Sequence, residues 1–425
     1  MQKQFRALWQ SRFIQQVSTL ASGTVIAHAV TLILLPVLGR LYEVGDFGIQ
    51  GLFIAVINSL AIGLNGGYEM TIMLPTTDRE AKHLLQLSTG IAVGFTGIVW
   101  GGLVLSGSWI WHRLDMPELY SWQLLLVGGL LIEGLSQPLR VMLNRLQKYK
   151  VLSGSRVAQA FVSNVTMLVI GYLDGGFYGL LVGFIAGQAA GFAVLVAGYL
   201  LWKERTTISI DWQMCRELAY TYRDFPTKGL WAGWLNAISR QLPFYLLPAF
   251  FSQEAAGFYT VANRALMSPF SLLSRSVGEV FYEKAARAKE EGKQVLGTLT
   301  RQTATYLSLA GLVPLLVVLV AGPFLVTLIF GETWRTTGEY AQYLMPWVYL
   351  MFVASPLSYL IDVQRRLGFL LRYNIALFGL RLAALLIGGY FLVDSQTVML
   401  YSALGSFMVA FHIRFLLKIG HVWER

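Results

Sequence analysis

Charged residues and cysteine are scarce in this chain of 425 residues. Only 13% of the residues are charged, against about a quarter in soluble globular domains. The single cysteine, Cys215, excludes an intrachain disulfide and a metal site built from cysteines. The histidines lack the spacing of metal ligands, so we expect no metal and no cofactor. Lysine and arginine, which give a net charge of +10, are spread over short segments instead of one basic domain, which argues against nucleic-acid binding.

Long apolar stretches make up most of the sequence. Hydrophobic residues account for 55% of the chain and the mean hydropathy is +0.56. A helix needs about 20 residues to cross the hydrocarbon layer of a bilayer, and at that length only a helix satisfies its own backbone in lipid. The sequence therefore predicts an all-α polytopic membrane protein with twelve spans. These are residues 17–39, 47–66, 84–106, 121–144, 157–173, 178–200, 229–251, 256–280, 303–328, 339–361, 372–392 and 397–417.

The positions of lysine and arginine predict the orientation. Of the loops that alternate with these spans, the outside set holds only Arg40, Arg113 and Arg335, and four further arginines lie deep within spans, five or more residues from either end. The positive-inside rule therefore predicts that both termini are cytoplasmic. Ahead of the first span, apolar side chains recur every four residues, which predicts a short helix in the membrane interface, or alternatively a cytosolic tail.

A polar interruption divides the chain into two halves. We predict an N-lobe over 1–200, a cytoplasmic linker over 201–228 and a C-lobe over 229–425. Leu-Leu-Pro at 34–36 followed by Gly48 is echoed by Leu-Leu-Pro at 246–248 followed by Gly257. The echo predicts two six-helix lobes with a pseudo-two-fold relation, an architecture in which substrate binds between the lobes and access alternates.

Four glycines recur every four residues in the predicted span 178–200. They are Gly179, Gly183, Gly187 and Gly191. A row of small residues lets a neighbouring helix approach closely, so we expect this row to pack against another span.

Arginine deep within the predicted spans, away from their ends, is the main functional signal. The four are Arg240, Arg264, Arg275 and Arg381. An arginine facing lipid costs about 2.5–3.5 kcal/mol on insertion scales, which favours turning these side chains onto a wet cavity. Carboxylates are fewer at this depth, and guanidinium matches phosphate oxygens bidentately, so we expect an anionic substrate. The structural alternative is that Arg275 pairs with Glu279, and that Arg240 or Arg264 pairs with Glu133.

Other polar residues in or beside the spans complete the predicted site. Side chains four or seven residues apart share a helix face, which places Asn236 with Arg240 and Asn374 with Arg381. The residues predicted to contact substrate, besides the four arginines, are Asn236, Asn263, Asn374 and Tyr68. The predicted sites of ion coupling are Glu133, Glu69 and His28. For His28 the alternative is an interhelical hydrogen bond instead of a proton relay.

Two blocks of the sequence carry a resemblance to a known family. Residues 22–88 contain Gly67-Tyr68-Glu69, and residues 222–286 contain the run Tyr-Arg-Asp-Phe-Pro at 222–226. Both blocks resemble the polysaccharide-synthesis branch of the multidrug/oligosaccharidyl-lipid/polysaccharide exporter superfamily, the O-antigen flippases. One departure is Gly67, which stands where that family often has arginine. Lipid II flippases usually carry further C-terminal helices after the twelfth span, which makes that assignment less favoured.

The resemblance implies transport and not enzymatic catalysis. Such a protein lies in the bacterial inner membrane and moves an undecaprenyl-diphosphate-linked oligosaccharide between leaflets, coupled to H⁺ or Na⁺, beside a polysaccharide polymerase and a chain-length regulator. The alternatives are a multidrug exporter or another lipid-linked-precursor exporter of the same fold. A membrane-embedded polymerase is less favoured because the predicted outside loops are short.

Overall fold

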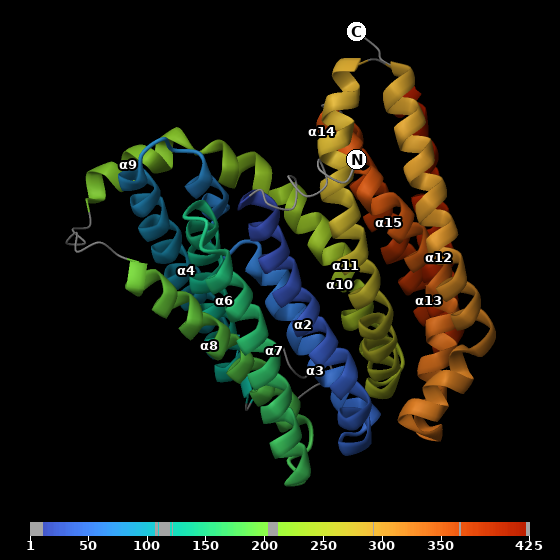
Figure 1. Ribbon diagram of the computed structural model, residues 1–425. Coiled ribbons are helices and arrows are strands. Elements are labelled where there is room, and N and C mark those ends of the chain that lie inside the picture. The colour runs from blue at the N-terminus through green and yellow to red at the C-terminus, as the bar shows by residue number, and fades with distance from the viewer. Residues whose placement is uncertain are drawn as a thin grey trace. The chain divides into compact units, whose positions relative to one another are not determined.

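The computed structural model of the protein describes residues 12–106, 109, 120, 122–202, 211–291, 293–364 and 367–421 (Figure 1). All regular secondary structure within these residues is helical. The interfacial helix predicted ahead of residue 17 falls largely on residues 1–11, outside the described residues.

Each predicted span coincides with a long helix in the described part of the chain. These helices are α2 (Arg12–Leu41), α3 (Val44–Ala61), α4 (Asp78–Ser106), α6 (Gln123–Arg145), α7 (Tyr149–Tyr172), α8 (Phe177–Trp202), α10 (Leu230–Phe250), α11 (Gln253–Glu291), α12 (Lys293–Phe330), α13 (Arg335–Leu357), α15 (Leu367–Phe391) and α16 (Asp394–His421). Shorter elements connect them: η1 (Tyr68–Met73), α9 (Trp212–Thr221), η3 (Phe225–Gly229), η4 (Glu332–Trp334) and α14 (Tyr359–Val363). Within the residues described, nine helices are long and apolar enough to cross a membrane, and α7, α10 and α11 are not among them. The all-helical membrane fold is confirmed, whereas twelve crossings and cytoplasmic termini stay predictions.

The chain forms two compact units. The first takes in the described residues up to Tyr42 together with Leu52–Ile238, and the second takes in Glu43–Gly51 and Ser239 onward. Helices α3 and α10 therefore each contribute residues to both units. The predicted division into two lobes and a linker stays a prediction.

In the first unit, the glycine row of α8 packs against α7. The position of Gly183 abuts the backbone of Ser163 and the side chain of Met167, so that no side chain fits there. The Ser155 hydroxyl donates to the carbonyl of Gly191 at 2.8 Å. The packing predicted for this row is confirmed.

The segment predicted as a linker contains α9, which is part of the first unit. Asp211 caps this helix by accepting from the Met214 amide at 3.1 Å. Leu218 packs with a buried cluster formed by Ile72, Ala81, Leu84 and Met142. Leu218 of α9 thus packs with buried residues of η1, α4 and α6.

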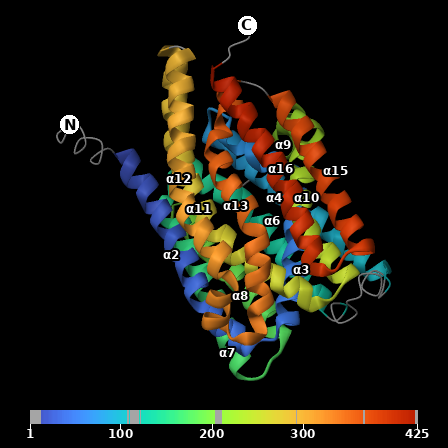
Figure 2. The same cartoon turned by 90° about the vertical axis from the view of Figure 1, so that its right-hand side faces the viewer.

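In the second unit, α13 lies among α11, α12 and α16 (Figure 2).

The beginnings of α3 and α11, which both belong to the second unit, contact each other at two glycines. Gly48 lies against the carbonyl of Gln253, and Gly257 lies against the carbonyl of Val44, four residues before Gly48. The contact is reciprocal, which is the pattern that a pseudo-two-fold relation between the repeated segments predicts.

Candidate functional site

Arg381 lies in an aromatic cage within the second unit. Arg381 is 2% exposed, and its guanidinium donates to the Ser239 hydroxyl at 3.1 Å. The guanidinium carbon lies 5.0 Å from the ring centre of Trp347 and 5.7 Å from that of Tyr401. Both distances are within the range of a cation–π interaction. α10, α13, α15 and α16 together therefore enclose a positive charge.

Arg240 follows Ser239 directly and is exposed. Arg381 donates to the hydroxyl of Ser239, the residue next to Arg240, so two positively charged side chains belong to neighbouring positions. Among the described residues, no carboxylate lies within 4.0 Å of the guanidinium nitrogens of any of the four predicted arginines. This leaves the guanidinium of Arg240 available to an anion from outside the chain.

Arg264 lies on α11 in a different setting. It is half-buried and donates to Gln50 Oε1 at 2.9 Å, and Gln50 is fully buried. An amide oxygen fixes the direction of the guanidinium without cancelling its charge. Gln50 is a residue that sequence reasoning missed, since a single glutamine near the start of a span gives no periodic signal.

Arg275 is exposed farther along α11. Glu279 is also exposed, and the two form no ion pair within 4.0 Å in the described structure. The local pairing considered for these two residues is therefore absent.

The three predicted asparagines are all half-buried. Asn374 lies on α15 two turns before Arg381, Asn263 precedes Arg264 on α11, and Asn236 lies on the part of α10 that belongs to the first unit. Their contacts with substrate stay predictions.

In the first unit, Glu133 has a partner on its own helix. Arg140 donates to Glu133 Oε1 to form an ion pair, and Gln137 donates to the same oxygen at 3.3 Å. The sequence had suggested Arg240 or Arg264 as the partner. Positions seven apart lie on one face of a helix, which explains why Arg140 reaches Glu133.

His28 lies half-buried on α2, close in sequence to two threonines that bind α7. Arg156 donates to the hydroxyl of Thr24, and Asn164 donates to that of Thr31 at 3.4 Å. Arg156 is a further arginine that sequence reasoning missed, because span five was predicted to begin at 157 whereas α7 begins at Tyr149.

The Gly67-Tyr68-Glu69 segment belongs to the first unit. Gly67 has φ 77°, a left-handed conformation that favours glycine, and its position lies against the backbone of Phe225. The Tyr68 hydroxyl donates to the carbonyl of Ala219 at 3.0 Å. The two sequence blocks that carry the family resemblance are therefore in contact.

Glu69 is the neighbouring acid. It is half-buried, and its Oε2 is buried without a hydrogen-bond partner. Burial raises the pKa of the Glu69 carboxyl, and a hydrogen bond from its own backbone amide lowers it by less. This carboxyl is thus easier to protonate than an exposed glutamate.

Comparisons with known proteins bear on the family and the fold. A family model described as "Polysaccharide biosynthesis protein" matches residues 37–338. A search of curated proteins found no match.

Solved structures of transporters share the fold. An inward-facing multidrug resistance MATE family transporter of the MOP superfamily matches with a TM-score of 0.71 at 13% identity, over 96% of this chain and 98% of that chain. The lipid II flippase MurJ in an inward closed conformation matches with a TM-score of 0.72 at 13% identity, over 94% of this chain and 87% of that chain. A MOP superfamily transporter from Pyrococcus furiosus, described as having a binding pocket of reverse polarity, matches with a TM-score of 0.62 at 13% identity, over 95% of each chain.

These matches confirm the family resemblance seen in the sequence. The solved structures, at 13% identity, establish the fold alone. The family match covers well over half of the chain, and the protein therefore belongs to the polysaccharide biosynthesis protein family, as a multi-pass membrane protein with the fold of the MOP superfamily.

Proposed function

We propose that the protein is a flippase for an undecaprenyl-diphosphate-linked oligosaccharide, such as an O-antigen repeat unit. It moves this lipid across the bacterial inner membrane by alternating access between two six-helix lobes. Twelve spans, cytoplasmic termini and coupling to H⁺ or Na⁺ belong to the proposal. The observation that carries it is the set of four arginines that no carboxylate of the described residues neutralises.

The arginines take different parts in this proposal. Arg240 and Arg275, whose side chains are exposed, contact the diphosphate directly. Arg264 does so in the direction that Gln50 fixes. Arg381 is enclosed and acts through Ser239 and through its field on Arg240. A diphosphate carries several oxygens in a small volume, which suits more than one guanidinium.

Sugar contacts are assigned to the three asparagines and to the Gly67-Tyr68-Glu69 segment. Asn236, Asn263 and Asn374 each offer both a donor and an acceptor from a half-buried position. Tyr68 already donates to Ala219, so its oxygen can only accept from a sugar hydroxyl.

Ion coupling is assigned first to Glu69. Its Oε2 is buried without a partner, and protonation would remove the cost of that buried charge. Glu133 is the weaker candidate because Arg140 already neutralises it. His28 stays a candidate for a proton relay.

A multidrug exporter is the second candidate, since a MATE transporter shares the fold. The unpaired arginines favour an anion over the cationic drugs that acidic cavities attract. Drug susceptibility of a deletion strain distinguishes the two functions.

The test replaces single arginines in a strain that lacks the chromosomal copy. We expect Arg240→Ala and Arg264→Ala to reach the membrane in normal amounts and to abolish long surface polysaccharide on gels. Arg240→Lys should restore part of it, because lysine keeps the charge and loses the bidentate geometry.

Arg335→Ala is the matched control. Arg335 is exposed and pairs with Glu332 at 3.3 Å, so its loss removes a charge that is already neutralised. Normal export by both Arg240→Ala and Arg264→Ala would overturn the proposal.

A further inference from the structure

Arg264 and Arg275 lie on one polar face of α11. They are eleven residues apart, which corresponds to three turns and about 16.5 Å along the helix axis. Between them the same face carries only hydroxyl groups, on Ser268 and Ser271, and the Ser271 hydroxyl donates to the carbonyl of Ser268 at 3.0 Å. Two positive charges are therefore separated along this face by a neutral stretch.

Gln50 holds the guanidinium of Arg264 away from Arg275. Arg264 donates to Gln50 Oε1 at 2.9 Å, and Gln50 is fully buried on α3. The glycines at positions 48 and 51, on either side of Gln50, lie against residues 253–260 at the beginning of α11. Gln50 therefore draws the Arg264 side chain toward the beginning of α11, whereas Arg275 lies in the opposite direction along the helix.

The two guanidinium groups are too far apart to share one diphosphate. A guanidinium binds a phosphate oxygen at about 2.7–2.9 Å, and the two phosphates of a diphosphate share a bridging oxygen, so that all of its oxygens lie close together. Side chains on one helix tilt toward the same end, so the separation along α11 is preserved. Among the described residues, no carboxylate lies within 4.0 Å of either guanidinium. Each charge is therefore available to a phosphate group by itself.

We infer that α11 carries two separate diphosphate sites, one at Arg275 and one at Arg264, and that Gln50 is the positioning residue that keeps them apart. The occupant is the diphosphate head group of the polyprenyl-linked oligosaccharide, so the inference rests on the proposed function. In the proposed orientation, α11 ends on the cytoplasmic side. The head group then binds at Arg275 first and at Arg264 second.

The test titrates inorganic pyrophosphate into the purified full-length protein in detergent, by isothermal titration calorimetry. Pyrophosphate carries the charge of the head group without its hydrocarbon, so it reports on the phosphate sites alone. We expect Arg264→Gln and Arg275→Gln each to weaken a different site about 10- to 100-fold, the range for losing a charged hydrogen-bond partner. The double variant should lose both sites, with additive effects, because independent sites do not couple.

Gln50→Glu tests the positioning role without removing an arginine. Glutamate has nearly the size of glutamine and places a carboxylate against Arg264, so it neutralises that charge where it lies. We expect it to weaken the Arg264 site as much as Arg264→Gln does and to leave the Arg275 site unchanged. A purely structural role of Gln50 would instead lower the unfolding temperature and weaken both sites together.

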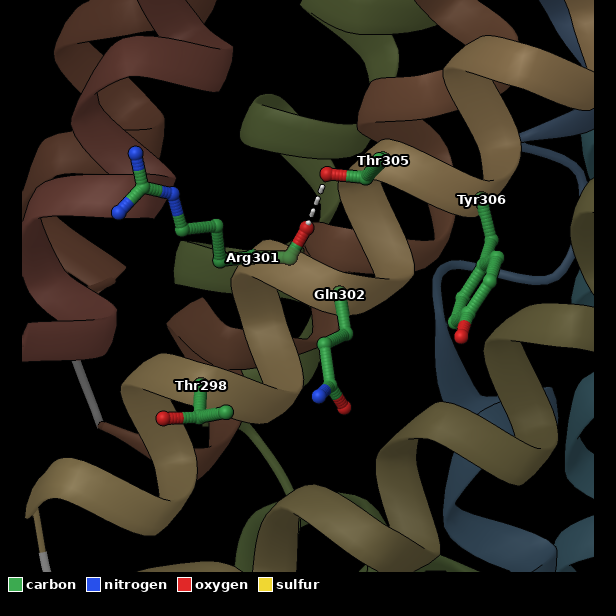
Figure 3. A pocket seen from close by; sticks show the side chains of 5 residues that line it. All are labelled: Thr298, Arg301, Gln302, Thr305 and Tyr306. Carbon is green, nitrogen blue, oxygen red and sulfur yellow. Dashed lines mark hydrogen bonds between the residues drawn. The ribbon is translucent and has the colours of Figure 1, made fainter.

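Arg301→Gln is the matched control. Arg301 belongs to the same unit and is exposed, as Arg275 is, and no carboxylate of the described residues lies within 4.0 Å of its guanidinium. It lies on α12, in a hollow lined by Thr298, Arg301, Gln302, Thr305 and Tyr306 (Figure 3). The control removes the same charge from another helix, so both sites on α11 should bind as in the unchanged protein.

The outcomes separate this inference from the proposed function. Loss of the same single site in Arg264→Gln and Arg275→Gln overturns the two-site arrangement, and so does the absence of pyrophosphate binding. Equal weakening of the α11 sites by Arg301→Gln overturns it as well, because binding then follows the net charge. Weakening of both sites by Gln50→Glu overturns the positioning role. Normal export by Arg240→Ala and Arg264→Ala would overturn the flippase proposal alone.

Discussion

Replacing Arg381 by methionine removes a buried positive charge and keeps a long unbranched side chain. The change deletes the hydrogen bond to Ser239 and the contacts with the rings of Trp347 and Tyr401. A charged hydrogen bond contributes about 1.5–3 kcal/mol, and each cation–π contact contributes about 1 kcal/mol. The lost interactions therefore sum to about 4 kcal/mol.

The opposing contribution is the desolvation of the guanidinium. Arg381 is 2% exposed and has no carboxylate partner in the described structure. Enclosing an ion costs several kcal/mol, and apolar replacements of buried charges are often neutral or stabilising. The two contributions nearly cancel, so we expect Arg381→Met to change the free energy of unfolding by less than about 2 kcal/mol. The unfolding temperature should shift by less than about 5 °C.

We expect Arg381→Met to affect the export of surface polysaccharide more strongly than it affects the stability of the protein. If the positive field beside Arg240 serves an anionic substrate, Arg381→Met loses long surface polysaccharide while the protein remains folded. Arg381→Lys should retain part of the export. The assay pairs thermal unfolding of the purified variant with gel analysis of surface polysaccharide. A well-folded Arg381→Met variant that exports normally refutes the role of the charge, and a variant that no longer folds shows that the cage depends on it.

Three further predictions concern the first unit. Glu133→Gln and Arg140→Gln should each lower the unfolding temperature, because each leaves one charge of the ion pair without its partner. The double variant should be more stable than the less stable of the two single variants. If the losses of stability in the single variants instead add up in the double variant, the ion pair is contradicted. Gly183→Leu should prevent folding because α7 fills the space, whereas Gly94→Leu, which meets open space, should accumulate normally as judged by size-exclusion chromatography. Burial raises the pKa of the Glu69 carboxyl, so its contribution to stability is largest below the ordinary value of about 4.3 and is lost as the pH rises through the raised pKa. Glu69→Gln should flatten that part of the curve of unfolding temperature against pH, and an unchanged slope would show that another group titrates.

Much of the fold could be predicted because a bilayer imposes one rule on every span. Runs of about 20 predominantly apolar residues predicted the long helices, nine of which, among the described residues, are long and apolar enough to cross a membrane, and the glycine row of α8 predicted a close packing partner. Helix ends were less predictable. α7 begins at Tyr149, eight residues before the expected span, because hydropathy reports composition whereas the backbone continues the helix into polar sequence. That difference is why Arg156 was counted outside the spans.

The sequence by itself determined that the chain is an all-helical membrane protein with arginines in its apolar segments, since composition and periodicity act along one chain. Only the tertiary structure decided the surroundings of those arginines. Arg381 is enclosed by rings from α13 and α16, Arg264 is held by a glutamine more than two hundred positions away, and Arg240 stays exposed. Desolvation and pairing depend on which distant segments meet, and no local pattern encodes those neighbours.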